Sequence, residues 1–143
     1  MRGKQADLHR LFHMVKYCRK LQFVGDTVQT YERFIAKENF RWIDLSSFYI
    51  GQIGELARGL SDEMKSTLAD IPWRQINDMR NKLIHHYGER DPQIIWLVVT
   101  KDAPALAARC LEVLRSENPD VDAELHEELI EEGVIEGGDE VGN

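Results

Sequence analysis

Apolar residues recur at helical spacing through most of the chain. Near the N-terminus they predict an amphipathic helix over about 5–24, ended by Gly25. The apolar positions of this helix are Leu8, Leu11, Phe12, Val15, Cys18 and Leu21. Asp26 or Thr27 can then cap a shorter helix, which Asn39 would end. The pattern therefore indicates two helices in this part of the chain, with a short break between them.

A long helix over 41–59 follows, and it carries two glycines three residues apart, Gly51 and Gly54. A glycine inside a helix costs about 1 kcal/mol relative to alanine, so the pair predicts that another helix approaches closely here. Ser61 is placed to cap a short helix that ends before Pro72. These signals indicate successive helices joined by short turns.

The next predicted helix, over 73–87, carries the polar residues of greatest chemical interest. After it, Asp91-Pro92 has the form of an N-cap followed by proline at the first helical position. The β-branched run over 94–100 is also compatible with a strand, but the cap signal favours a helix. A last helix is expected over 103–116. The expected fold is thus all-α, a compact bundle of four to five helices.

Charge divides the chain into two parts. At 143 residues it has the size of one domain. Of its 25 acidic and 18 basic residues, eleven acidic and no basic ones follow from Glu117 onward, which leaves 18 − 14 = +4 for 1–116. We therefore expect a helical domain over 1–116 and an acidic, mostly disordered tail over 117–143. Within the tail, one or two weak amphipathic turns are expected at Leu125, Leu129 and Ile130. The charge of the domain permits binding to nucleic acid without demanding it.

The two cysteines, Cys18 and Cys110, stand apart from each other and from any Cys/His cluster. This spacing argues against a disulfide framework or a structural zinc site and suits a reducing compartment. The N-terminus lacks the pattern of a signal peptide, and the longest apolar run, 94–99, is far too short to span a membrane. We expect a cytoplasmic protein that contacts no membrane and uses neither a metal nor a cofactor.

Three side chains of the helix 73–87 have the properties that phosphodiester chemistry needs. Arg80 is a permanent planar cation suited to phosphate oxygens. His85 can take or give a proton near neutral pH. Asn81 can orient either group through its amide. They are candidate catalytic residues for phosphodiester chemistry.

Helical geometry places these residues on different flanks. Arg80 falls within the apolar stripe of its helix and therefore needs a partner, for which Glu55 is the best candidate. His85 lies about 140° away, on the flank of Asn81 and Asp78. One interpretation is a buried Arg–Glu ion pair beside an ordinary surface histidine. The other is a phosphate site that lies over this flank or is completed by a second subunit.

Four short sequence elements occur in the order typical of one family. They are Ile53-Gly54-Glu55, Ile71-Pro72-Trp73, the stretch Met79-Arg80-Asn81-Lys82-Leu83-Ile84-His85-His86-Tyr87, and Ile94-Ile95-Trp96. This order resembles the HepT-like HEPN-domain toxins, whose signature R-x4-H-x-Y lies in an "mRN" stretch after a "pW" start. The resemblance covers about 5–116 and does not include the acidic tail.

The resemblance implies an α-helical bundle, a homodimer and a metal-independent ribonuclease that is the toxin of a type II/VII-like toxin–antitoxin pair. By position, it implies that Arg80 and His85 are the catalytic pair, supported by Asn81. It also implies an MntA-like nucleotidyltransferase antitoxin as partner, which silences the toxin by adding AMP to Tyr87. The alternative is a non-catalytic helical module that docks a nucleotidyltransferase. The complete set of polar motif residues favours the ribonuclease, because a docking module needs no such set.

Overall fold

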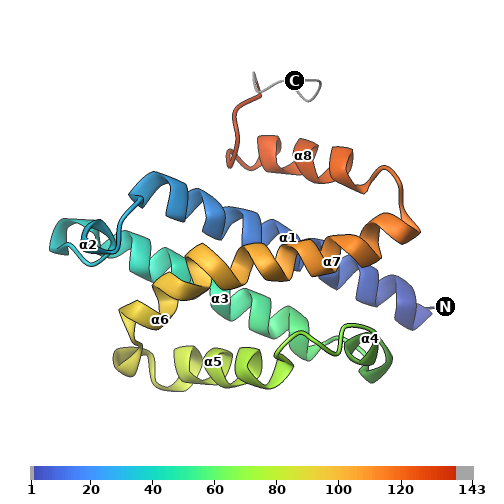
Figure 1. Ribbon diagram of the computed structural model, residues 1–143, viewed down its shortest axis with the longest axis horizontal. Coiled ribbons are helices and arrows are strands. Elements are labelled where there is room, and N and C mark those ends of the chain that lie inside the picture. The colour runs from blue at the N-terminus through green and yellow to red at the C-terminus, as the bar shows by residue number, and fades with distance from the viewer. Residues whose placement is uncertain (1, 138–143) are drawn as a thin grey trace.

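A computed structural model describes residues 2–137, and the regular structure in this range is entirely helical (Figure 1). The α-helices are α1 Arg2–Val28, α2 Tyr31–Phe34, α3 Phe40–Arg58, α4 Asp62–Thr67, α5 Trp73–His85, α6 Pro92–Leu97, α7 Ala103–Glu117 and α8 Val121–Glu131. Short 3-10 turns η1 Lys37–Asn39 and η2 Tyr87–Glu89 and a π-helical segment η3 Val98–Asp102 join some of them. The all-α bundle predicted from the sequence is confirmed. None of the described helices has the length and apolar character needed to cross a membrane.

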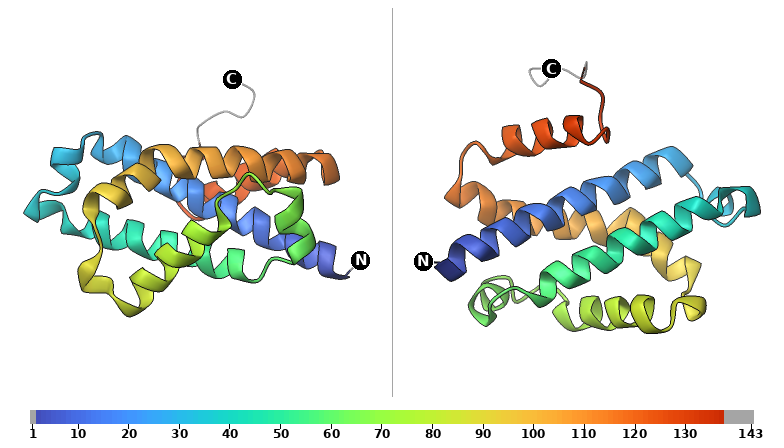
Figure 2. Two further views of the ribbon diagram at one scale, coloured as in Figure 1. Left: turned by 60° about the horizontal axis from the view of Figure 1, so that its bottom comes forward. Right: turned by 180° about the vertical axis from the view of Figure 1, so that it is seen from behind.

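The core lies where α3 and α7 each pack along α1 (Figure 2). Its largest fully buried side chains are Phe34, Leu11, Met14, Leu21, Leu68, Ile95 and Leu111. Helix α5 lies along α3 at one edge of the bundle, and α8 lies against α1 and α7 at the opposite edge. The motif helix and the acidic C-terminal helix are therefore on opposite sides of the molecule.

The N-terminal helix runs one turn further than predicted. Gly25 does not end α1, which continues to Val28. A Cβ at this glycine would lie 3.2 Å from the Val99 Cγ1 atom, so Gly25 allows α1 to pass close to the π-helical segment instead of stopping it. The predicted cap at 26–27 is consequently wrong. The N-cap of α2 is Thr30, whose hydroxyl accepts a backbone hydrogen bond from the first turn.

Helices α6 and α7 form one bent helical run rather than a strand followed by a helix. The predicted cap is present, since the Asp91 carboxylate accepts a hydrogen bond from the Gln93 amide at 2.9 Å. Between the helices, the Ala103 amide donates to the Val98 carbonyl five residues back. Pro104 follows directly. A proline has no amide hydrogen and its ring collides with the carbonyl four residues back, so the wider π turn accommodates it.

The expectation of disorder after Glu117 is wrong for residues 121–131, which form α8. Val121, Leu125 and Leu129 recur on one face of α8 and are all buried. Partners outside the tail hold this face in place, and Lys16 of α1 donates to Glu128 at 2.8 Å. Composition alone does not show such tertiary contacts. The last predicted tail residues, 138–143, lie outside the described range.

Candidate functional site

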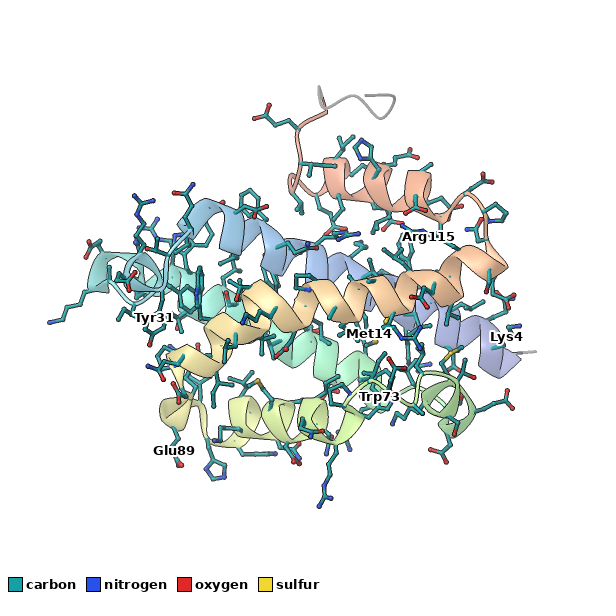
Figure 3. All side chains as sticks on the ribbon, viewed as in Figure 1. Lys4, Met14, Tyr31, Trp73, Glu89 and Arg115 are labelled. Atoms are coloured by element: carbon teal, nitrogen blue, oxygen red, sulfur yellow. The ribbon has the colours of Figure 1, made fainter. Side chains whose placement is uncertain are left out.

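The motif residues occupy α5 and the turn η2 that follows it. Figure 3 labels Trp73 and Glu89, which stand at the two ends of this segment. The indole of Trp73 donates a hydrogen bond to the Leu68 carbonyl at 3.0 Å and so fixes the start of α5 to the end of α4. Helix α5 ends at His85, two residues earlier than predicted, and Tyr87 lies in the 3-10 turn.

Helices α3 and α5 approach each other most closely at Gly54 and Arg80. A Cβ at Gly54 would lie 2.4 Å from the Cβ of Arg80, which is closer than two carbon atoms can pack. Only glycine at this position leaves room for the arginine stem. The predicted close approach is thus confirmed at Gly54. It is wrong for Gly51, where a Cβ would meet nothing within 4 Å.

Glu55, the residue after this glycine, holds the Arg80 guanidinium in place. Arg80 Nε donates to Glu55 Oε1 at 2.5 Å, and Arg80 Nη2 forms an ion pair with the same oxygen. Arg80 Nη1 donates to Asn81 Oδ1 at 2.8 Å. The Arg80 side chain is 13 % exposed, whereas that of Glu55 is 45 % exposed. The pairing expected from the sequence is therefore present, and it fixes a cation at the surface of α3 and α5.

His85 lies on another flank of α5. It is exposed, as are its neighbour His86 and Asp78, which lies on the same flank as His85. The second histidine is tied to the η2 turn, since His86 Nδ1 lies 3.4 Å from a carboxylate oxygen of Glu89. As the helical geometry predicted, Arg80 and His85 do not point into one pocket of the single chain. The structure thus brings Arg80, Asn81 and Glu55 together and leaves His85 and Asp78 apart from them.

Ile84 and Tyr87 follow the helical spacing of the apolar stripe that contains Arg80, but both are exposed. Ile84 is 48 % and Tyr87 43 % exposed. Helix α5 lies at the edge of the bundle, so the face it buries is narrower than its apolar stripe. Tyr87 has also left the helix, and its ring takes its direction from the η2 turn.

Tyr87 belongs to a polar cluster that the sequence did not reveal. Its hydroxyl donates to Asp44 Oδ1 at 2.9 Å, and Arg90 Nη2 donates to the same oxygen at 2.6 Å. The Arg90 guanidinium lies 3.8 Å from the centre of the Tyr87 ring. Its Nη1 atom is buried and has no hydrogen-bond partner among the described residues. Asp44 and Arg90 were missed because they are close to Tyr87 only in space.

One stripe of α3 runs from the polar group around Arg80 to the polar cluster around Tyr87. Asp44, Phe48 and Glu55 are four and seven residues apart and so face the same way. The two carboxylates lie about 16 Å apart along the helix axis. Arg80 binds one end of this stripe and Tyr87 the other. The tyrosine hydroxyl and the Arg80 guanidinium therefore share a surface but are not neighbours on it.

Apolar side chains lie between these two ends. Phe48 is 55 % exposed and Ile84 is 48 % exposed, although both are large. A cavity of about 500 Å³ lies on the other flank of α5, against α6 and α7, and includes neither Arg80 nor His85 among its lining residues. The motif thus faces an open surface with apolar and polar parts.

Comparison with known proteins identifies the family of this chain. The model of the family "Ribonuclease HepT-like" matches residues 14–113. A "Probable ribonuclease HepT" of Thermococcus cleftensis is 30 % identical over 96 residues, which cover 62 % of this chain and 87 % of the relative. A "Putative RNase" of Caldanaerobacter subterraneus subsp. tengcongensis is 37 % identical over 65 residues, 46 % of this chain. That match spans 58 % of the relative's own length.

A third relative, a "Putative RNase" of Methanocaldococcus jannaschii, is 29 % identical over 76 residues, 53 % of this chain and 68 % of its own length. No solved structure matches. The matched range contains α3 and α5 with the whole Gly54–Arg80 crossing, and it ends before α8. On these grounds the chain belongs to the HepT-like ribonuclease family, and the family supports a ribonuclease activity.

Proposed function

We propose that this protein is a metal-independent endoribonuclease that cleaves RNA by attack of a ribose 2′-hydroxyl on the adjacent phosphate. His85 acts as the general acid or base, a role worth about 10²–10⁴-fold in rate. Arg80 stabilises the negative charge that develops on the phosphate oxygens, and Asn81 orients the Arg80 guanidinium. The observation that carries the proposal is the anchorage of Arg80, whose stem lies against Gly54 while Glu55 and Asn81 hold its head.

The proposed active site is composite and needs a second copy of the chain. Arg80 and His85 lie on different flanks of α5, so one chain does not offer both to one phosphate. A two-fold axis near α5 would place His85 of one chain opposite Arg80 of the other. The exposed side chains of Phe48 and Ile84 support this arrangement, because a partner would cover them.

The proposed biological role is that of a toxin of a type II/VII-like pair, silenced by an MntA-like nucleotidyltransferase that adds AMP to Tyr87. Tyr87 is exposed, which supports this role, since its hydroxyl oxygen can attack the α-phosphate of ATP. An O–P bond then forms, pyrophosphate leaves, and Asp44 is placed to accept the hydroxyl proton. Arg90 lies beside the ring with one unpartnered nitrogen, where it can pair with the new phosphate.

Incubation of the purified protein with RNA in EDTA tests the proposed chemistry. Products that end in 2′,3′-cyclic phosphate are expected. His85→Ala should lower the rate by about 10²–10⁴-fold. His86→Ala is the matched control, because His86 is equally exposed on the next position and should keep most of the activity. Loss of cleavage in EDTA, with recovery on addition of a divalent ion, would contradict the mechanism.

The alternative function is a helical module that docks a nucleotidyltransferase without cutting RNA. The exposed apolar side chains Phe48 and Ile84 fit a docking face as well as a dimer interface. Binding of the nucleotidyltransferase by a protein that leaves RNA intact in the same preparation would favour the docking module. Cleavage that depends on His85 and not on His86 would favour the ribonuclease.

A further inference from the structure

Helix α1 carries a stripe of basic side chains on the face that α8 covers. His9, His13, Lys16 and Lys20 are spaced four, three and four residues apart, so they lie on one side of the helix. The two lysines are about 6 Å apart along the axis. This stripe faces away from the motif helix, because α5 and α8 lie at opposite edges of the bundle.

Carboxylates at the C-terminal end of α8 form ion pairs with both Lys16 and Lys20. Lys16 Nζ donates to Glu128 Oε1 at 2.8 Å and forms a second ion pair with Glu132. Lys20 Nζ donates to the other oxygen of Glu132 at 2.5 Å. The lysine side chains are only 10 % and 18 % exposed. Glu128 of α8 and Glu132 at its C-cap thus pair with two lysines that are one turn apart on α1.

Aromatic rings lie directly beside these cations. Lys20 Nζ is 5.3 Å from the centre of the Tyr17 ring and 5.7 Å from that of the Tyr49 ring. Cations spaced along a track, with aromatic faces at its side, are the combination that binds single-stranded nucleic acid without sequence preference.

We propose that this surface of α1 and α3 is a second RNA-binding site, distinct from the motif, and that α8 covers it as an internal competitor. The carboxylates of Glu128 and Glu132 take the positions on Lys16 and Lys20 that RNA phosphates would occupy. The choice of RNA as the ligand rests on the proposed function. The inference that α8 covers the two lysines rests on the observed ion pairs. A strand bound here would increase the retention of RNA on an enzyme whose cleavage site lies elsewhere.

Two features make α8 suited to a removable cover. The family match ends at residue 113, so the HepT-like domain is recognised without α8. The connection to α7 is a single short link at Asn118-Pro119, where the backbone leaves the helical conformation. The ion pairs of Glu128 and Glu132 remain partly exposed to solvent, so salt and polyanions can compete with them.

Binding of a fluorescent 2′-O-methyl oligouridine tests the proposal. This probe lacks the nucleophilic hydroxyl, so binding is measured without cleavage. Glu128→Gln/Glu132→Gln should tighten binding and steepen the dependence of log K on log salt by about 1.4, since two freed lysines each contribute about 0.7 for single strands. The matched control is Glu127→Gln/Glu131→Gln, which removes the same charge from exposed positions of α8 that form no ion pair with the described residues. The control should change the slope little.

Adding Lys20→Gln to the first variant should remove about half of the gained slope, about 0.7. Equally tighter RNA binding by the control variant would mean that α8 acts only through its net negative charge, and this result would overturn the proposal. Unchanged binding in the Glu128→Gln/Glu132→Gln variant would also overturn it. Because the probe cannot be cleaved, these affinities do not depend on catalysis, so a failure of the proposed catalysis is measured separately.

Discussion

At the scale of single residues, Gly54 decides whether Arg80 can occupy its place. Gly54→Ala puts a methyl group 2.4 Å from the Arg80 Cβ, so α3 and α5 must separate. We expect a loss of about 1–3 kcal/mol in the free energy of unfolding, together with lost RNA cleavage. Gly51→Ala is the control, because its methyl group meets open space and should stabilise α3 by up to about 1 kcal/mol. Urea unfolding measures both, and equal effects would contradict the close crossing.

Tyr87 is the residue at which the proposed silencing acts, through its hydroxyl group. Incubation with the nucleotidyltransferase and ATP should add one or more AMP units, seen by intact mass, and should abolish cleavage. Tyr87→Phe should prevent the addition while leaving the ring and its Arg90 contact in place. The Arg90→Gln variant should still accept AMP. Once modified, it should keep more cleavage activity than the modified unsubstituted protein, because it lacks the cation that pairs with the added phosphate. Modification of another residue would remove Tyr87 from this role.

The sequence predicted these sites unevenly, and distance along the chain explains the difference. The Arg80–Glu55 pair could be anticipated because an arginine on an apolar stripe needs an acid, and Glu55 stands beside the glycine that allows contact. Asp44 carries no such local signal. Asp44 accepts a hydrogen bond from Tyr87 only because α5 ends at His85 and the η2 turn redirects the tyrosine ring. Neither the end of α5 nor this turn follows from helical spacing.

At the scale of elements, prediction succeeded where the signal is local. Ser61 and Asp91 both accept a hydrogen bond from the first turn of their helices, as their sequence context predicts. It failed where tertiary packing outweighs local preference. Gly25 reads as a helix stop but serves close packing against the π-helical segment. Helix α8 reads as a solvated acidic tail, and its order depends on the bundle beneath it.

The docking of α8 should depend on pH. Hydrogen bonds from Lys16 and then Lys20 hold the pKa of Glu132 below its ordinary 4.5, and the Arg115 guanidinium does the same for Asp122, whose ordinary value is 3.8. Groups with a lowered pKa stabilise the folded state above their ordinary values, and this contribution is lost as pH falls through the folded values. Hydrogen-exchange protection of α8 should therefore fall below about pH 3.8 while that of α3 persists. Parallel loss in both helices would mean that α8 does not open separately.

At the scale of the whole molecule, the arrangement of α3 and α5 at an edge predicts how copies associate. Phe48→Glu/Ile84→Glu should give a monomer in light scattering and should abolish cleavage, because two charges cannot be buried in an interface. Phe23 and Leu97 are also large and exposed but lie outside the α3–α5 surface. Phe23→Glu/Leu97→Glu is thus the matched control and should leave the dimer intact. Full activity in an obligate monomer would contradict the composite site.

The composite site also predicts complementation between inactive chains. A dimer of Arg80→Ala chains lacks both cations, and a dimer of His85→Ala chains lacks both proton-transfer groups. A mixed dimer keeps one intact pair, His85 from the first chain and Arg80 from the second, because each site draws one residue from each protomer. Random mixing places half of the dimers in this state, and each has one of two sites, so about a quarter of the original activity should return. If each chain instead held a complete site, every mixed dimer would carry two broken sites, and mixing would restore nothing.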